Sequence, residues 1–315
     1  EFSMKSTLIS LRIGTPFWFP EEGCQGLLRS LAPYTPPLEE VALFTSFTHP
    51  PVPLARLLAI ADRAGEVLPR FRELGLRAGI NLLSVYGHLD ENLDNSLQGP
   101  LQRMMDLEGN TGQGSFCPLD PGLQEYARAG LIALAKAEPD FIWIDDDLRL
   151  EGHGPVGFAC FCNRCLARFG EETGQAWTRA ALKQAFAGRD SLPLRRAWLA
   201  HNRRLLRGTL ELIRAAVDEV DPTLELGLMS GEAVYSGLGH GGWLDALGSQ
   251  DAGPARFRPG GGFYQDTVPT ELLSKAHSIG RQVSLTSPDV VVIQSELENF
   301  PYCRQIGRAS CRERV

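Results

Sequence analysis

The sequence has no excess of basic residues and no long apolar run. Its 31 Lys and Arg residues stand against 38 Asp and Glu residues, which gives a net charge of −7 at pH 7. An acidic chain without a basic stripe is not expected to bind nucleic acid. No apolar run approaches the roughly 20 residues that a helix needs to span a bilayer, so we expect no membrane association.

A secretion signal is also lacking, because residues 1–4 (Glu-Phe-Ser-Met) contain no basic stretch followed by an apolar one. Cysteines are few. Of the seven, Cys160, Cys162 and Cys165 stand close together. Such clustering is typical of a metal site in a reducing compartment rather than of a disulfide framework. We therefore expect a cytoplasmic protein.

Strand-like apolar segments alternate with amphipathic helical segments along most of the chain. Strands are predicted at residues 8–19, 39–47, 77–86, 141–144, 224–229, 255–263 and 290–293, and helices at 54–76, 121–137, 175–187, 192–220, 243–247 and 271–279. This alternation predicts an α/β fold with a parallel sheet covered by helices. Seven such units favour a (β/α)8 barrel, or TIM barrel. A doubly wound sheet is the alternative, although no glycine-rich phosphate turn follows the first strand.

An eighth strand is not found, and an aperiodic, basic segment ends the chain. Residues 305–315 resemble the translation of a sequencing-adapter read-through and are left out of the fold prediction. We therefore expect one barrel domain over residues 4–303, truncated before its eighth strand, followed by a non-native tail over residues 304–315. Such a fragment is expected to be inactive.

Three consecutive carboxylates, Asp145, Asp146 and Asp147, follow the fourth predicted strand. The carboxyl ends of parallel strands are where α/β folds place their chemistry. Adjacent carboxylates repel each other, so at least one should resist ionisation unless a cation or a donor relieves it. A solvated acidic loop is the alternative interpretation.

Two further carboxylates, Glu296 and Glu298, follow the seventh predicted strand. In a barrel the strand ends converge on one face, so the acidic groups after strands four and seven are expected to meet across the mouth. Two carboxyl groups facing each other across a pocket are the minimum equipment for glycoside hydrolysis, one as acid and one as nucleophile or base. A salt bridge at the rim is the alternative for either glutamate alone.

Three clustered thiolates, Cys160, Cys162 and Cys165, predict a metal site. Zinc prefers four tetrahedral nitrogen or sulfur ligands, and Cys117 and His153 are the candidates for the fourth. Four protein ligands leave no position for water, so the predicted zinc ion is structural. Buried hydrophobic cysteines without a metal are the alternative.

These residues together resemble glycoside hydrolase family 42, which comprises β-galactosidase-like enzymes with a (β/α)8 barrel. In that family a strand-four Asp-Asn-Glu motif is followed by a His and by Cys-x-Cys-x2-Cys, and an upstream cysteine completes a zinc site. Residues 145–147, His153, residues 160–165 and Cys117 are similar in layout, as residues 17–22 are to the family's aromatic-Pro-Glu segment after strand one. The resemblance implies Asp147 as acid/base and Glu296 as nucleophile. Asp147 stands where the family has Glu, and Asp146 where it has Asn.

Residues at other strand exits are predicted to bind the sugar. The predicted sugar-binding residues are Asp145, Asp146, Glu298, Trp18, His88, Glu232, Arg258 and Tyr264. Trp18 is expected either to stack on a sugar face or to pack in the core, and Tyr264 follows glycines that let the backbone approach a ligand. The expected partners are an oligosaccharide or glycoside substrate and, in the full-length protein, further copies of the chain.

Hydrolysis of O-glycosidic bonds is therefore the predicted function, and two alternatives stay open. One is a metal-dependent hydrolase in which Asp145–Asp147 and His153 bind a catalytic cation, although the usual His-x-His pair after a first strand is missing. The other is a carbohydrate-binding barrel that has lost its catalytic pair.

Overall fold

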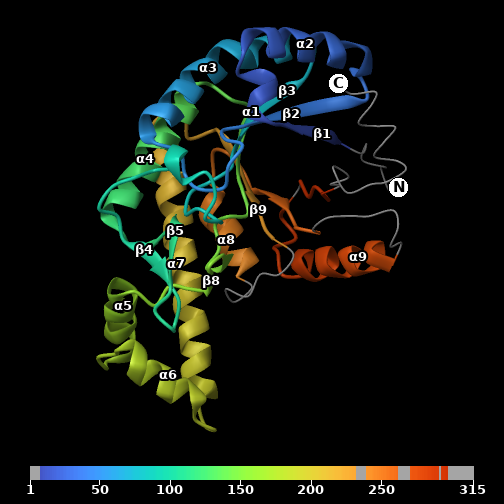
Figure 1. The fold of residues 1–315 in the computed structure, drawn as a ribbon. Helices are drawn as coiled ribbons and strands as arrows, with labels where there is room; N and C mark the ends of the chain where they lie inside the picture. Colours follow the sequence, from blue (N-terminus) through green and yellow to red (C-terminus); the bar gives the residue numbers. More distant parts are fainter. Residues whose placement is uncertain (1–7, 232–238, 262–269, 291, 297–315) are drawn as a thin grey trace, which may run out of the picture.

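The computed structural model describes residues 8–231, 239–261, 270–290 and 292–296. Six parallel strands form one curled sheet (Figure 1) in the order β1 (Ile9–Ile13), β2 (Leu38–Phe44), β3 (Arg77–Leu82), β6 (Phe141–Ile144), β9 (Glu225–Met229) and β10 (Arg256–Arg258). Beyond β10, Ile293 forms a parallel bridge to Phe257. The predicted α/β class is confirmed, and the sheet has the curvature and strand order of an open part of a TIM barrel.

Helices connect successive strands and cover the outer face of the sheet (Figure 1). They are α1 (Thr15–Trp18), α2 (Glu21–Leu31), α3 (Leu54–Arg72), α4 (Pro121–Lys136), α7 (Leu192–Asp218), α8 (His240–Leu247) and α9 (Thr270–Val283), with short 3-10 turns η1 (Ala32–Tyr34) and η2 (Leu93–Asn95). Asp120 begins α4, where its carboxylate accepts hydrogen bonds from the backbone N–H groups of Gly122 and Leu123.

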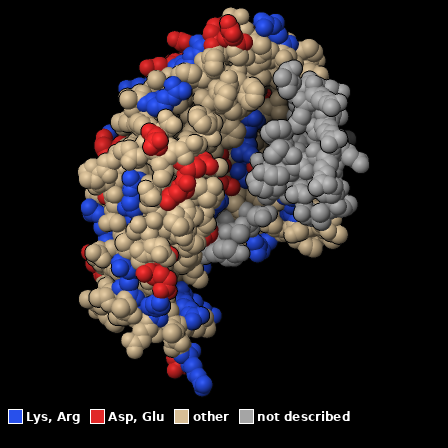
Figure 2. Space-filling model, viewed as in Figure 1, with Lys and Arg blue, Asp and Glu red and all other residues tan. Residues whose placement is uncertain are grey.

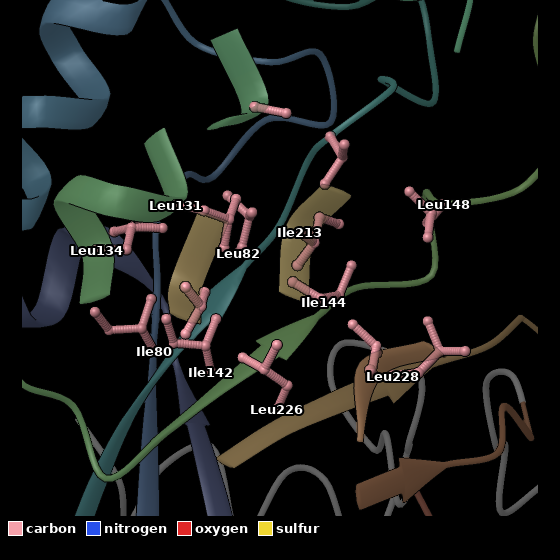
Figure 3. Packing of buried hydrophobic residues seen from close by; sticks show 14 of the residues in the cluster. Ile80, Leu82, Leu131, Leu134, Ile142, Ile144, Leu148, Ile213, Leu226 and Leu228 are labelled. Carbon is pink, nitrogen blue, oxygen red and sulfur yellow. The ribbon is translucent and has the colours of Figure 1, made fainter. Parts of the chain in front are cut away.

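Alternate residues of the strands point outward and form the main core with the helices (Figure 3). Ile80 and Leu82 of β3, Ile142 and Ile144 of β6, and Leu226 and Leu228 of β9 pack together with Leu131 and Leu134 of α4 and Ile213 of α7. The intervening residues point into the barrel, as the two-residue period of a strand requires. By the same period Asp145, which follows β6, continues the inward row of Phe141 and Trp143.

Small residues make room for the large inward-facing aromatics. A Cβ atom at Gly79 would lie 2.2 Å from the ring of Phe141, and one at Gly227 would lie 2.3 Å from the ring of Trp143. Gly227 is the cross-strand neighbour of Trp143 in the β6–β9 pair. The barrel interior is therefore packed by pairing a large residue on one strand with glycine on the next.

An ion pair is buried below the aromatic residues. One amino nitrogen of Arg256, on β10, lies 2.7 Å from each carboxylate oxygen of Glu40, on β2. The Arg256 guanidinium also lies over Phe141, 4.3 Å from the ring centroid, and Gln294 donates a hydrogen bond of 3.1 Å to Glu40. This layer joins opposite sides of the curved sheet through polar contacts.

A satellite of helices and hairpins projects from the barrel between β3 and β9 (Figure 1). It contains the hairpins β4 (Arg103–Met105)–β5 (Thr111–Phe116) and β7 (Glu151–His153)–β8 (Val156–Phe158), and the helices α5 (Asn163–Thr173) and α6 (Arg179–Ala187) with the start of α7. Its small core is formed by Phe161, Leu166, Phe169, Leu182 and Trp198. The sequence prediction missed both hairpins and α5 of the satellite, and it also missed α2 of the barrel.

Several predicted boundaries differ from the structure. The first predicted strand, 8–19, ends at Ile13, and α1 follows it. The seventh, 290–293, contributes only the bridge at Ile293 among its described residues. The predicted tail, 304–315, lies outside the described residues.

The charged surface and the helices agree with the composition. On the face in Figure 2, acidic and basic side chains are interspersed over the helical layer, without one extended patch of a single sign. Among the described residues, no helix combines the length and apolar character needed to cross a membrane.

Candidate active site

The first of the three aspartates lies at the floor of the barrel mouth. Asp145 is buried, its Oδ2 accepts a hydrogen bond of 2.8 Å from Asn81 of β3, and its Oδ1 accepts one of 2.8 Å from the N–H of Asp146. Burial raises the pKa of Asp145, and the nearby charges of Arg12 and Arg258 oppose that rise.

Two arginines connect Asp145 with Glu296. Arg258, at the end of β10, places Nη1 3.0 Å from Glu296 Oε2 and Nη2 3.4 Å from Asp145 Oδ1. Arg12, on β1, contacts Glu296 Oε1 and lies 3.8 Å from Asp145 Oδ2. The carboxylates that follow β6 and Ile293 are therefore held around a shared pair of guanidinium groups.

Asp146 is the most accessible of the three aspartates, with a side chain that is 32% exposed. Arg149 lies 3.3 Å from Asp146 Oδ1, and Arg258 lies 4.0 Å from Oδ2. Burial alone would raise the pKa of Asp146, but the charges of Arg149 and Arg258 together lower it. Asp146 therefore offers an ionised carboxylate at the mouth.

Asp147 has a different environment from the one expected of an acid at the mouth. Its Oδ2 accepts hydrogen bonds of 2.7, 2.8 and 2.9 Å from the N–H groups of Val85, Tyr86 and Gly87, which form the loop after β3. Burial raises its pKa to about 7 despite these three bonds. No hydrogen bond or ion pair within the described part of the chain joins it to Glu296. Its catalytic role stays a prediction.

Histidines and Arg149 line the side of the mouth next to Asp146. Arg149 Nη2 lies 2.8 Å from His88 Nε2, and the His88 ring lies against both His49 and His153. Burial, with the charge of Arg149, lowers the pKa of His88 to about 3, so this ring is neutral at pH 7. His88 thus lies near the carboxylates, where a sugar hydroxyl group could reach it.

The other predicted sugar-binding residues have varied outcomes. Trp18 is fully buried and donates a hydrogen bond of 3.1 Å to the carbonyl oxygen of Phe44. It therefore packs in the core and does not present a face to a sugar. Arg258 lies in the centre of the site. Glu232, Tyr264 and Glu298 lie outside the described residues.

Arg12 and Arg149 were missed by the sequence prediction. Arg12 is a charged residue within the apolar strand β1. A charged residue at such a position indicates a functional role, and this was the signal in the sequence that could have identified Arg12. Arg149 lies in a loop, where an arginine gives no such signal.

Four buried cysteines form a compact cluster beside the satellite. Sulfur atoms of Cys117, Cys160, Cys162 and Cys165 all lie within 4.8 Å of one another, and the Cys117 sulfur lies 3.6 Å from that of Cys165 and 3.5 Å from that of Cys162. All four are free thiols. Tetrahedral zinc with bonds of about 2.3 Å to sulfur requires sulfur–sulfur distances of roughly 3.8 Å, which this cluster approaches.

His153 was the other candidate for the fourth ligand, and it is not part of this cluster. Its Nε2 lies 2.7 Å from the carbonyl oxygen of Arg149, on the side of the barrel mouth. The cysteine at position 117 reaches the cluster because β5 ends at Phe116, next to the start of α5 at Asn163.

Comparison with known proteins shows that the fold is similar to that of several solved structures. No protein-family model and no curated protein sequence matches the chain. The catalytic domain of β-amylase from Paenibacillus polymyxa is similar, with a TM-score of 0.59 and 11% identity over 92% of this chain and 85% of that one.

Two β-galactosidases are also similar in fold. The enzyme from Bacillus circulans sp. alkalophilus has a TM-score of 0.57 and 14% identity over 89% of this chain, and the enzyme from psychrophilic Marinomonas ef1 has 0.54 and 12% over 80%. The chain spans 43% and 40% of the lengths of these two proteins. At such low identities these likenesses concern the fold alone.

Proposed function

We propose that the chain forms the catalytic barrel of a glycoside hydrolase that cleaves O-glycosidic bonds. The observation that supports this most is the meeting of carboxylates after β6 and Ile293, with Arg258 bonded to Glu296 and within 4.0 Å of Asp146. The folds of the β-amylase and the two β-galactosidases support the same class of reaction. The resemblance to family 42 suggests β-galactosides as the first substrates to test.

In the proposed mechanism Glu296 is the nucleophile or base. Its two oxygens contact Arg12 and Arg258, and these two contacts fix the carboxylate at the mouth of the barrel. A nucleophile has to be held in a fixed position toward the reacting carbon of the sugar, and these contacts suit that role.

We assign the partner role to Asp146, because a catalytic group has to touch the substrate and Asp146 is the accessible aspartate. As an acid it needs a proton, which its lowered pKa disfavours in the free site. A bound sugar that excludes water and separates Asp146 from Arg149 and Arg258 would raise that pKa. Burial raises the pKa of Asp147, to which the family motif points, to about 7, but its carboxyl group is buried below the β3 loop.

Substitution of the three carboxylates tests this assignment on a panel of chromogenic glycosides with the purified full-length protein. Glu296→Gln and Asp146→Asn should each lower kcat by roughly 10²–10⁴-fold, with unchanged melting. Asp147→Asn should keep most activity, since its amide oxygen can still accept the three backbone hydrogen bonds. If Asp147→Asn is inactive while Asp146→Asn is active, Asp147 is the acid. A wild-type protein that cleaves no glycoside would refute the proposed reaction.

A metal-dependent hydrolase is disfavoured by the charges around the aspartates. Arg12, Arg149 and Arg258 surround Asp145 and Asp146 and would repel a cation. Within the described ranges, the cysteine cluster is the group whose ligand atoms are close enough to hold a metal.

We propose that this cluster, Cys117, Cys160, Cys162 and Cys165, binds one structural zinc ion. Four thiols buried together cannot all ionise without a cation, and zinc would supply that charge. Bound zinc would tie the end of β5 to the start of α5. A site of reduced cysteines also agrees with the cytoplasmic location expected from the sequence.

A further inference from the structure

Phe47 lies on the loop that follows β2 and is the most exposed large apolar residue in the part of the chain that the structure describes. Its side chain is 67% exposed, whereas its neighbours Ser46 and Thr48 are buried. Exposing a phenyl ring forgoes the free energy of burying it, but single exposed apolar side chains are common on protein surfaces, so the surroundings of the ring decide whether it has a role.

The backbone on both sides of Phe47 is fixed. The Ser46 hydroxyl accepts a hydrogen bond of 3.0 Å from the N–H of Thr48. Glu91 Oε1 accepts bonds from the Thr48 hydroxyl, at 3.1 Å, and from the N–H of His49, at 2.9 Å. The loop therefore holds the ring in solvent through several hydrogen bonds, so a ligand would not have to order it on binding.

The same loop adjoins the candidate active site on the side of Asp146. The His49 ring lies 5.2 Å from the ring of His88, and His88 lies against Arg149. Arg149 in turn lies 3.3 Å from the Asp146 carboxylate. Phe47 therefore lies two residues before His49, the first of four side chains that each contact the next (His49, His88, Arg149 and Asp146). The last of these is the proposed acid.

Apolar exposure is shared by neighbouring strand exits. Phe17 after β1 and Leu89 after β3 are also exposed, while most charged groups of the site lie at the ends of β6 and β10 and after Ile293. Exposed apolar side chains are therefore found at the exits of β1, β2 and β3. An apolar ring recognises the C–H face of a pyranose or an aryl ring, and it cannot hydrogen-bond to hydroxyl groups.

We infer that Phe47 is a stacking platform for the leaving-group side of the substrate, either the next sugar ring or an aryl aglycone. The inference rests on the proposed function, because the acid that protonates the leaving group lies on the same side as the loop. Phe47 would determine specificity without taking part in the chemistry, so it should act on KM and leave kcat largely unchanged.

The test compares Phe47→Ala and Phe47→Trp on three glycosides of one sugar: the disaccharide, the p-nitrophenyl glycoside and the methyl glycoside. Phe47→Ala should raise KM roughly three- to tenfold for the first two, and Phe47→Trp should restore it. The methyl glycoside, which has no ring to stack, should be unaffected. Tyr34→Ala is the matched control, because Tyr34 is 62% exposed but lies before β2, at the opposite end of the strands.

Equal KM values for Phe47→Ala and wild type on all three substrates would overturn the inference while the proposed function stands. If the wild type cleaves no glycoside, the proposed function fails, and oligosaccharide binding measured by calorimetry decides about Phe47. Weaker binding by Phe47→Ala than by wild type and Tyr34→Ala would then support the platform. Equal binding, or none by the wild type, would overturn it.

Discussion

Asp145, Asp146 and Asp147 are identical in side chain and adjacent in sequence, yet their surroundings differ. The side chain of Asp145 is 6% exposed, that of Asp146 is 32% exposed, and Asp147 is buried against backbone N–H groups. The sequence predicts that they lie at the mouth, because they follow a buried strand. It does not predict which one is accessible, since the two-residue period ends with the strand and the loop geometry depends on Arg149 and residues 85–87.

The raised pKa of Asp147 makes a prediction about stability. Its folded-state pKa of about 7 lies above the unfolded value of 3.8, so the folded protein holds this proton more tightly. The free energy of unfolding should therefore fall as pH rises from about 4 to about 7, by up to roughly 4 kcal/mol from this group. Asp147→Asn lacks the titrating group and should lose that part of the slope.

Urea denaturation of both proteins at several pH values between 4 and 8 checks the prediction. The difference between wild type and variant isolates Asp147 from other titrating groups. Parallel pH profiles for the two proteins would show that Asp147 titrates normally in the folded state.

Helices and strands of the barrel were predicted well where their apolar pattern is strong. Residues 54–76 contain the observed α3, and the predicted strand 141–144 coincides with β6. The hairpins of the satellite were not predicted, because β4, β7 and β8 have three residues each and β5 has two glycines among its six residues. A three-residue strand carries too few residues to show a period.

The proposed zinc site should control the stability of this satellite. Metal analysis of the purified protein should give about one zinc per chain, and Cys162→Ser should lower zinc content and melting temperature together, because the cluster loses a ligand. Cys24→Ala is the matched control: Cys24 is equally buried, in α2, and is remote from the cluster in sequence. Zinc-free protein that melts like the wild type would exclude a structural metal.

Across the whole molecule, the parallel order of strands followed from their alternation with helices, which is the most robust pattern in the sequence. What could not be predicted is the polar interior. Glu40 and Arg256 stand in strands far apart in the chain, and only the curvature of the sheet brings them to 2.7 Å. No local pattern contains that contact.

Breaking this ion pair should destabilise the whole barrel. Glu40→Gln removes the nearer carboxylate of the buried Arg256 and leaves only Glu225, 3.9 Å away, which should cost about 3 kcal/mol of unfolding free energy in urea denaturation. Arg128 and Glu219 form a comparable contact on the surface, where Arg128→Met should cost less than about 1 kcal/mol. Similar losses for the two variants would mean that the buried pair contributes no more than a surface pair.

Trp143 and Gly227 also have a consequence for how this barrel can evolve. Because the indole occupies the space that any side chain at position 227 would need, mutation of Gly227 alone meets a steric barrier. A smaller residue at position 143 removes that barrier, but by itself it leaves a cavity. Positions 143 and 227 should therefore co-vary among homologues. Replacement of Trp143 by a smaller residue should precede replacement of Gly227 by a larger one.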